Sequence, residues 1–300
     1  MLQEDVLQKY QKAGRIASKV RNMVPNLVHA GALIIDICNK VESMIHEHGG
    51  KPAFPCNVCI NNIAAHYTSP PGDVGTISEG SLVKVDIGVH VDGYIADTAV
   101  TICLNPEYSP LVEAVEIGLR EACTVIRPGL KASDVGTVIQ KAIETRGFKP
   151  IWNLCGHKTV RYLLHAGKSI PNVSHLNGEK IEADEVYAIE PFAVMKKAAG
   201  KVEELSEALI YRYMKDRPLK TDSAKLLLQR VKNEFRTLPF AKRWIQNSVP
   251  PLAFDNAFSE LLSSKAIVKY PVLAEASGSL VAQAEHTVIV TQKGCTVITL

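Results

Sequence analysis

Residues 84–100, KVDIGVHVDGYIADTAV, read as two β-strands around a tight turn, and each strand carries an aspartate where an apolar residue is expected. The turn is either Val-Asp at 91–92, which sets Asp86 directly opposite Asp97, or Asp-Gly at 92–93, which sets them diagonally and has the favoured turn chemistry. In both registers the two carboxylates lie on one face of the hairpin. Carboxylates about 5 Å apart repel each other unless a cation neutralises them. The hairpin therefore indicates a metal site, and a solvent-exposed polar face of an antiparallel sheet is the alternative.

Other isolated polar residues favour the metal site. Glu190 interrupts the apolar run VYAIEPF and Glu285 interrupts LVAQAEHTVIV, where an unpaired buried carboxylate would be costly. His157 follows a glycine in NLCGHKTV, and His165 lies eight residues later. This donor set suits Mn, Co, Fe or Zn. Four carboxylates on one ion would carry excessive negative charge, whereas two ions that share them could activate a water molecule.

Composition sets few further limits. A chain of 300 residues with 46% hydrophobic residues can form one large domain or one domain with an insertion. A net charge of +3 does not by itself indicate a nucleic-acid partner. The N-terminus has no apolar signal segment and no run is long enough to span a membrane, so we expect a cytoplasmic protein without a membrane partner. The seven cysteines, an odd number, are expected to be reduced thiols.

Helical and strand patterns alternate along the chain, which predicts an α/β domain. Helices are expected over 2–22, in the run from 27 to the glycines at 49–50, over 109–126, and from a cap at Ser133 to Gly147. Strands are expected over 185–195 and 279–291. Residues of about 215–270 are expected to be helical, with helices in SAKLLLQRVKNEFRTL and FSELLSSKAIV, and form a late insertion. Its first part, 215–243, holds nine Lys or Arg against three acids.

The motifs together resemble those of the type 2 methionine aminopeptidases, most closely their short archaeal form. The similarity rests on KPAFPCNVCINNIAAHYT, VKVDIGVHVDGYIADTAVT, GHKTVRYLLHAGKSIPN, YAIEPFA, TLPFAKRWIQN and AQAEHTVIV, in this order along the chain. The resemblance implies a pita-bread α/β (α+β) fold formed by residues 1–195 and 271–300, with a helical insertion subdomain at 196–270. It also implies a metallo-exopeptidase that removes the initiator methionine from nascent chains.

The resemblance also implies a role for each polar residue of the motifs. Asp86 would chelate one divalent ion, Asp97 and Glu285 would bridge two ions, and His157 and Glu190 would bind the second. Glu190 would in addition move the proton of the attacking water. Two ions per chain, of Co, Mn, Fe or Zn, would be needed.

Two histidines and an apolar pocket would hold the substrate. The resemblance implies that His66 lies near the scissile amide and that His165 polarises its carbonyl group. The methionine pocket would be lined by Phe54, Leu164, Pro239 and Tyr270, with Phe192 nearby. His286, although it neighbours Glu285, is expected to point to the opposite face of its strand, and His90 is expected to be solvated.

Two other functions remain open. A proline-specific aminopeptidase or prolidase of the same fold would use the same ligand set, and a pita-bread module that binds RNA or the ribosome would use the basic part of the insertion. The insertion could also dock the enzyme near the ribosome. We expect peptide substrates with N-terminal methionine, no DNA partner and a monomer. One departure from the family pattern is Ala284, where a phenylalanine is usual, which is expected to loosen the packing behind Glu285.

Overall fold

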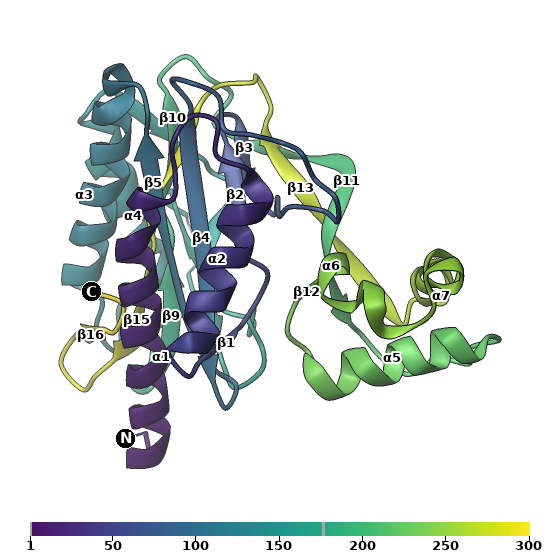
Figure 1. Ribbon diagram of the computed structural model, residues 1–300. Coiled ribbons are helices and arrows are strands. Elements are labelled where there is room, and N and C mark those ends of the chain that lie inside the picture. Colours follow the sequence, from purple (N-terminus) through teal and green to yellow (C-terminus); the bar gives the residue numbers. More distant parts are fainter. Residues whose placement is uncertain (1, 176–177) are drawn as a thin grey trace.

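The computed structural model describes residues 2–175 and 178–300 and forms layers of helices against β-sheets, with a group of helices set to one side (Figure 1). The helices are α1 Glu4–Met23, α2 Ile34–Glu47, α3 Ser109–Val125, α4 Ala132–Glu144, α5 Asp222–Glu234, α6 Lys242–Ile245 and α7 Pro251–Ser263. The first strands are β1 Lys51–Pro52, β2 Asn57–Ile60, β3 Ile63–Ala65, β4 Leu82–Val91, β5 Tyr94–Cys103, β6 Phe148–Pro150, β7 Cys155–Thr159 and β8 Ser169–Pro171. The others are β9 Val186–Ile189, β10 Phe192–Met195, β11 Val202–Tyr213, β12 Phe240–Ala241, β13 Ile267–Glu275, β14 Val281–Gln283, β15 His286–Val290 and β16 Cys295–Val297.

The hairpin of β4 and β5 forms the centre of the first layer. Gly88 pairs with Asp97 and Asp86 pairs with Ala99, so the two aspartates lie diagonally. The turn residues Asp92 and Gly93 have φ values of 53° and 88°, as the Asp-Gly turn requires. The structure thus has the register that the Asp-Gly turn favours, and the register centred on residues 91–92 is wrong.

Helices α1 and α2 cover this hairpin on the outside (Figure 1). Their apolar residues recur at helical spacing and bury Ile16, Val20 and Val41 against Val85 and Val89 in one core. Helix α2 begins at Ile34, later than the apolar run from residue 27 indicated, because residues 28–33 form an irregular segment. At Gly14 a Cβ atom would lie 2.1 Å from the carbonyl oxygen of Ile298, so only glycine allows this close approach.

Helices α3 and α4 pack on each other and cover two further sheets, formed mainly by strands that follow them in the chain (Figure 1). Beneath them lie a five-stranded sheet of order β16-β15-β9-β7-β8 and a three-stranded sheet of order β14-β10-β6. Helix α4 begins at Ala132, so the predicted cap at Ser133 is wrong. Asp134 instead accepts a hydrogen bond of 3.4 Å from the backbone N–H of Lys131, which precedes the helix.

The two apolar runs that carry Glu190 and Glu285 each cross from one of these sheets to the other. Strands β9 and β15 pair in the five-stranded sheet, and β10 and β14 pair in the three-stranded sheet. Glu190 lies in the break between β9 and β10, and Glu285 lies in the break between β14 and β15. The expected continuous strands are therefore each divided in two, and both glutamates lie at the same seam.

Residues after β10 begin with a long antiparallel pair, β11 and β13, and β13 also pairs with β3. The helices α5, α6 and α7 lie beyond this pair, on the side away from α1 and α3 (Figure 1). They share a core of their own that includes Leu227, Phe240 and Phe258. The predicted helix in FSELLSSKAIV ends at Ser263, and its last residues start β13 instead.

Helix α6 is held to α2 by a buried ion pair between Arg243 and Glu42, and the Trp244 Nε1–H donates to the same carboxylate at 2.8 Å.

The cysteines within the described ranges are all free thiols, as expected. No helix in those ranges is long and apolar enough to cross a membrane. His90 is buried, so the prediction that it is solvated is wrong. Its Nδ1 accepts a 3.0 Å hydrogen bond from the Gly93 N–H at the hairpin turn.

Candidate metal centre and substrate pocket

One narrow cavity of about 60 Å³ collects side chains from both halves of the chain. Asp86 comes from β4, Asp97 from β5, His157 from β7, and Glu190 and Glu285 from the two strand breaks at the seam between sheets. A second hollow of about 210 Å³ shares His157 and Glu190 with it. The structure therefore brings together all five residues that the sequence indicated as metal ligands.

The polar atoms of this cluster point at one another. The Nε2 atom of His157 lies 3.7 Å from an Asp97 oxygen and 3.6 Å from a Glu190 oxygen. One ligand atom each from Asp97, His157 and Glu285 lie within 4.8 Å of one another. Asp97 and Glu285 are 3% and 1% exposed, which rules out the alternative of a solvated polar sheet face.

Several of these buried atoms have no hydrogen-bond partner. Asp86 Oδ1, Asp97 Oδ1 and Glu285 Oε2 are unpaired, and no Lys or Arg in the described ranges forms an ion pair with the four carboxylates. Buried polar atoms in proteins are normally satisfied. The converging oxygen and imidazole donors thus fit divalent cations, and the fit rests on these unsatisfied atoms.

The pKa values of the cluster show that its buried carboxylates are unfavourable in the charged form. Burial raises the pKa of Asp86 to about 7, and burial together with the neighbouring carboxylates raises the pKa values of Asp97 and Glu285 well above the ordinary range. Burial also raises the pKa of Glu190, with a further contribution from Asp86, and lowers that of His157. Without a cation the site therefore favours protonated carboxyls and a neutral imidazole, whereas ligands must be deprotonated to bind metal.

His66 is held in a strained conformation beside the cluster. Its φ of 66° lies in the left-handed region, which is uncommon for a residue other than glycine and occurs often at functional sites. The Nδ1–H donates to the Pro271 carbonyl at 3.0 Å, so the Nε2 lone pair is left for another partner. Burial lowers its pKa, and the ring is therefore neutral near pH 7.

His165 lies against the metal-binding side of the cavity. Its ring centroid is 4.3 Å from that of His157 and 6.2 Å from that of Tyr270. Burial lowers its pKa to about 4, so this imidazole is also uncharged at neutral pH. Both histidines can thus exchange hydrogen bonds with a bound molecule without adding charge.

The apolar end of the cavity is formed by residues from distant parts of the chain. Phe54 and Leu164 belong to one small core cluster, and the cavity also contacts Pro239 and Tyr270. Gly88 makes room for the Phe54 ring, since a Cβ atom there would lie 2.2 Å from it. Phe192 does not line this cavity and contacts only the neighbouring hollow.

The sequence reasoning missed other residues of this site. Asn57, Ala65 and Ile210 also line the cavity, and Asn57 pairs with Asp86 across β2 and β4. Gln283 lies near Asp86, and in the described ranges its buried Nε2 has no hydrogen-bond partner. The spacing of two residues between Gln283 and Glu285 was a signal that they share a face, whereas no local signal indicated Ile210.

The chain matches the model of metallopeptidase family M24 over residues 8–292. It is 43% identical to a methionine aminopeptidase of Methanothermobacter thermautotrophicus over 98% of this chain and 99% of that protein. It is 47% identical to a methionine aminopeptidase of Thermococcus kodakarensis over 96% of this chain and 97% of that protein.

Solved structures share the fold at lower identity. A thermophilic Arx1 superposes with a TM-score of 0.83 at 19% identity and covers 99% of this chain and 91% of its own. A methionine aminopeptidase from Thermotoga maritima gives a TM-score of 0.72 at 21% identity, with 99% and 97% covered, and a prolidase from Pyrococcus furiosus gives 0.62 at 17%, with 99% and 64% covered. The predicted pita-bread fold is confirmed.

Proposed function

The chain belongs to metallopeptidase family M24, and we propose on this premise that it releases the N-terminal methionine from nascent proteins and peptides. Its activity is that of a methionine aminopeptidase, a metal-dependent hydrolase. The observation that carries the proposal is the convergence of four carboxylates, of which Asp97 and Glu285 are buried, and His157 beside an apolar pocket. The chain is more than 40% identical to curated methionine aminopeptidases over almost its whole length.

We propose that two divalent ions are held here. Asp86 would bind one ion, His157 and Glu190 the other, and Asp97 and Glu285 would contact both, which supplies each unsatisfied oxygen with a partner. When bound, such ions lower the pKa of water and polarise a carbonyl group. Co, Mn, Fe and Zn all suit these donors.

The protein groups would orient the substrate and move the proton. Glu190 would accept the proton of the attacking water, since its carboxylate lines the same cavity as the other proposed ligands. His165 would donate to the substrate carbonyl, and His66, which is fixed by Pro271, would face the leaving nitrogen. The thioether would lie against Phe54, Leu164, Pro239 and Tyr270, because a narrow apolar pocket accepts an unbranched side chain and excludes charged ones.

Finer assignments follow from the motifs. We propose that the protein is of the type 2 class, that it acts as a monomer, and that residues 196–270 form an insertion subdomain in a catalytic domain of residues 1–195 and 271–300. The separate core of α5, α6 and α7 supports this division, although β13 also pairs with β3 of the catalytic domain.

Docking at the ribosome through residues 215–243 is also proposed, but fewer of the basic residues there are free to bind RNA than the sequence indicated. Lys225, Arg230 and Lys232 each form an ion pair with a nearby acid, at 2.9, 3.0 and 2.7 Å. Reversing these three residues to glutamate should weaken co-sedimentation with ribosomes at low salt. Co-sedimentation that salt and these changes leave unaltered would exclude the idea.

The deciding experiment measures release of the first residue from Met-Ala-Ser and from Ala-Pro-Ser. Chelator-stripped protein is assayed before and after addition of Co or Mn, with an Asp97→Asn variant as the matched metal-site control. Metal-dependent cleavage of the methionyl peptide alone is expected. Cleavage of only the prolyl peptide would instead assign a proline-specific activity, and cleavage of neither would favour a binding module.

A further inference from the structure

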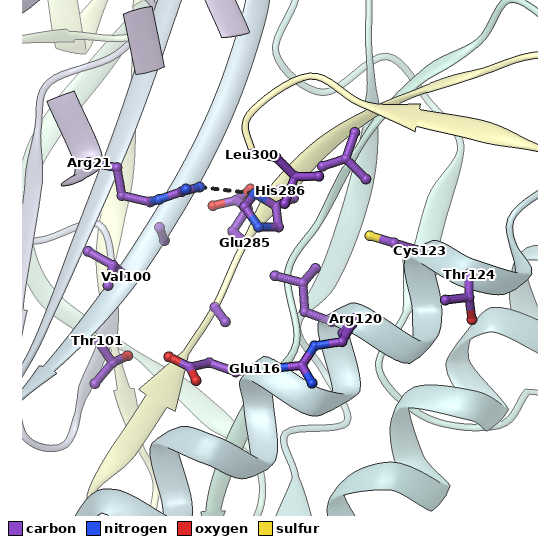
Figure 2. Close-up of a pocket in the computed structure, with 14 residues that line it drawn as sticks. Arg21, Val100, Thr101, Glu116, Arg120, Cys123, Thr124, Glu285, His286 and Leu300 are labelled. Atoms are coloured by element: carbon purple, nitrogen blue, oxygen red, sulfur yellow. Dashed lines mark hydrogen bonds between the residues drawn. The ribbon is translucent and has the colours of Figure 1, made fainter. Parts of the chain in front are cut away.

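A separate and larger cavity, distinct from the two hollows at the metal centre, lies next to the seam that carries Glu285. Its volume is about 530 Å³, and it is bounded by α1, β5, α3 and the segment of residues 284–286. Figure 2 shows Arg21 on one side, Glu116 and Arg120 from α3 on the other, and His286 between them. Glu285 borders both this cavity and the metal centre, whereas Arg21, Glu116 and Arg120 line this cavity and not the metal centre.

The cavity has the size and the walls of a small-molecule site. Such sites measure roughly 300–1,000 Å³ and are mainly apolar with a few polar groups. Here the apolar wall is formed by Ala99, Val100, Leu119, Ala284, Val297 and Leu300. The methyl side chain of Ala284 leaves space that a larger side chain at this position would fill.

Arg21 places a positive charge at one end of this cavity. Its Nη1 donates to Thr98 Oγ1 and to the Thr299 carbonyl, both at 2.7 Å, and lies 3.0 Å from His286 Nδ1. Because a guanidinium can only donate hydrogen bonds, the His286 Nδ1 accepts this one. In the described ranges Arg21 forms no ion pair with an acid, and it is half-buried. A half-buried guanidinium that forms no ion pair can pair with an anion that enters the cavity.

The other charged residues that line the cavity have partners of their own. Arg120 and Glu116 are one helical turn apart on α3, and the Arg120 charge opposes the effect of burial on the pKa of Glu116. These two groups offset each other, and the carboxylate of Glu285, the other acid on the lining, interacts with Asp97, Asp86 and Glu190 of the metal cluster. A guanidinium binds a carboxylate through paired hydrogen bonds.

We propose that this cavity binds a small monocarboxylate with an apolar body, whose carboxylate pairs with Arg21 and whose body lies against Leu119, Ala284 and Val297. The ligand supplies the missing counter-charge and covers the apolar wall at the same time. Because Glu285 borders both cavities, an occupant would contact the segment that positions this carboxylate at the metal centre. The proposal concerns a separate site and does not depend on the aminopeptidase activity.

The test is titration calorimetry of the metal-loaded protein with hexanoate, and with hexan-1-ol as a probe that has the same body without the charge. Hexanoate should bind saturably, and hexan-1-ol should bind at least tenfold more weakly. Arg21→Gln should weaken hexanoate binding by about 10- to 100-fold, the loss expected for a charged hydrogen bond. Arg15→Gln, on the exposed part of the same helix, should leave binding unchanged.

A second pair of variants separates this cavity from other sites and does not depend on Arg21. Thr124→Trp would fill the cavity from its rim and should abolish hexanoate binding, whereas Glu121→Trp, an exposed neighbour outside the cavity, should not. Equal affinity in wild type and Thr124→Trp would mean that hexanoate binds elsewhere, including the metal centre, and would overturn the proposal. Absence of saturable binding up to about 10 mM would overturn it as well.

Discussion

Replacing Asp86 by asparagine should stabilise the metal-free protein, and the gain should grow as the pH rises. Burial raises the pKa of this carboxyl from 3.8 to about 7, against smaller opposing effects of Asp97 and Gln283. The folded state thus holds a proton that the unfolded state releases near pH 4. Stability from this group is fully present below pH 4 and is lost as the pH rises through 7, since the unfolded state binds fewer protons over that range. Asparagine carries no charge at any pH and avoids this loss.

The size of the effect follows from the two pKa values. Each pKa unit corresponds to about 1.4 kcal/mol, and integration from pH 5 to pH 8 gives about 2.6 kcal/mol for a shift from 3.8 to about 7. Asp86 is partly exposed, so solvent screening reduces this figure. We expect Asp86→Asn to gain about 2 kcal/mol of unfolding free energy over wild type between pH 5 and pH 8.

Urea unfolding of chelator-treated wild type and Asp86→Asn at both pH values measures this difference. Asp36→Asn, an exposed aspartate on α2, is the matched control and should show no comparable change. With divalent metal present the order should reverse, because wild type then has the better ligand. A gain in the metal-free protein that does not change with pH, or an unchanged order when metal is added, would refute the reasoning.

Four further outcomes are expected. Asp97→Asn should reduce kcat/KM more than Asp86→Asn, because a shared ligand serves both ions, and equal losses in steady-state assays would contradict the shared position. His165→Ala should lower kcat by about 100-fold while metal affinity, measured by calorimetry, stays unchanged. Glu42→Gln should cost about 3 kcal/mol in urea unfolding, since it leaves Arg243 buried without its counter-charge. Activity should fall at acid pH and return with added divalent ion, because protonated ligands release metal, and full activity in strong chelator would exclude a metal role.

The sequence predicted those parts of the structure that local chemistry determines. Asp-Gly turn chemistry favoured the observed one of two possible hairpin registers. Apolar spacing and the glycines at 49–50 predicted the first two helices, apart from the start of α2. The convergence of Asp86, Asp97, Glu190 and Glu285 was predicted because single acids in apolar runs are costly unless they meet a cation.

Other features depend on tertiary context that sequence patterns do not carry. The breaks at Glu190 and Glu285 were not predicted. The residues on both sides of each break are buried in a sheet, so the apolar sequence continues across the seam. His90 was assigned to solvent from its position near a turn, but its ring packs against Tyr162, with centroids 5.7 Å apart, and borders one hollow together with residues of α2 and of the insertion. For the cavity beside Arg21, the sequence contained one indication, which was the small residue Ala284.

The position of the two glutamates at the seam has a consequence for the order of folding. The ligands are spread from residue 86 to residue 285, and the two glutamates meet the hairpin only when both sheets have docked. Such contacts between distant parts of the chain form late, because loop closure must precede them. Metal should therefore slow unfolding without accelerating folding, and a ribosome-bound chain would acquire its metal only after nearly the whole sequence has been synthesised.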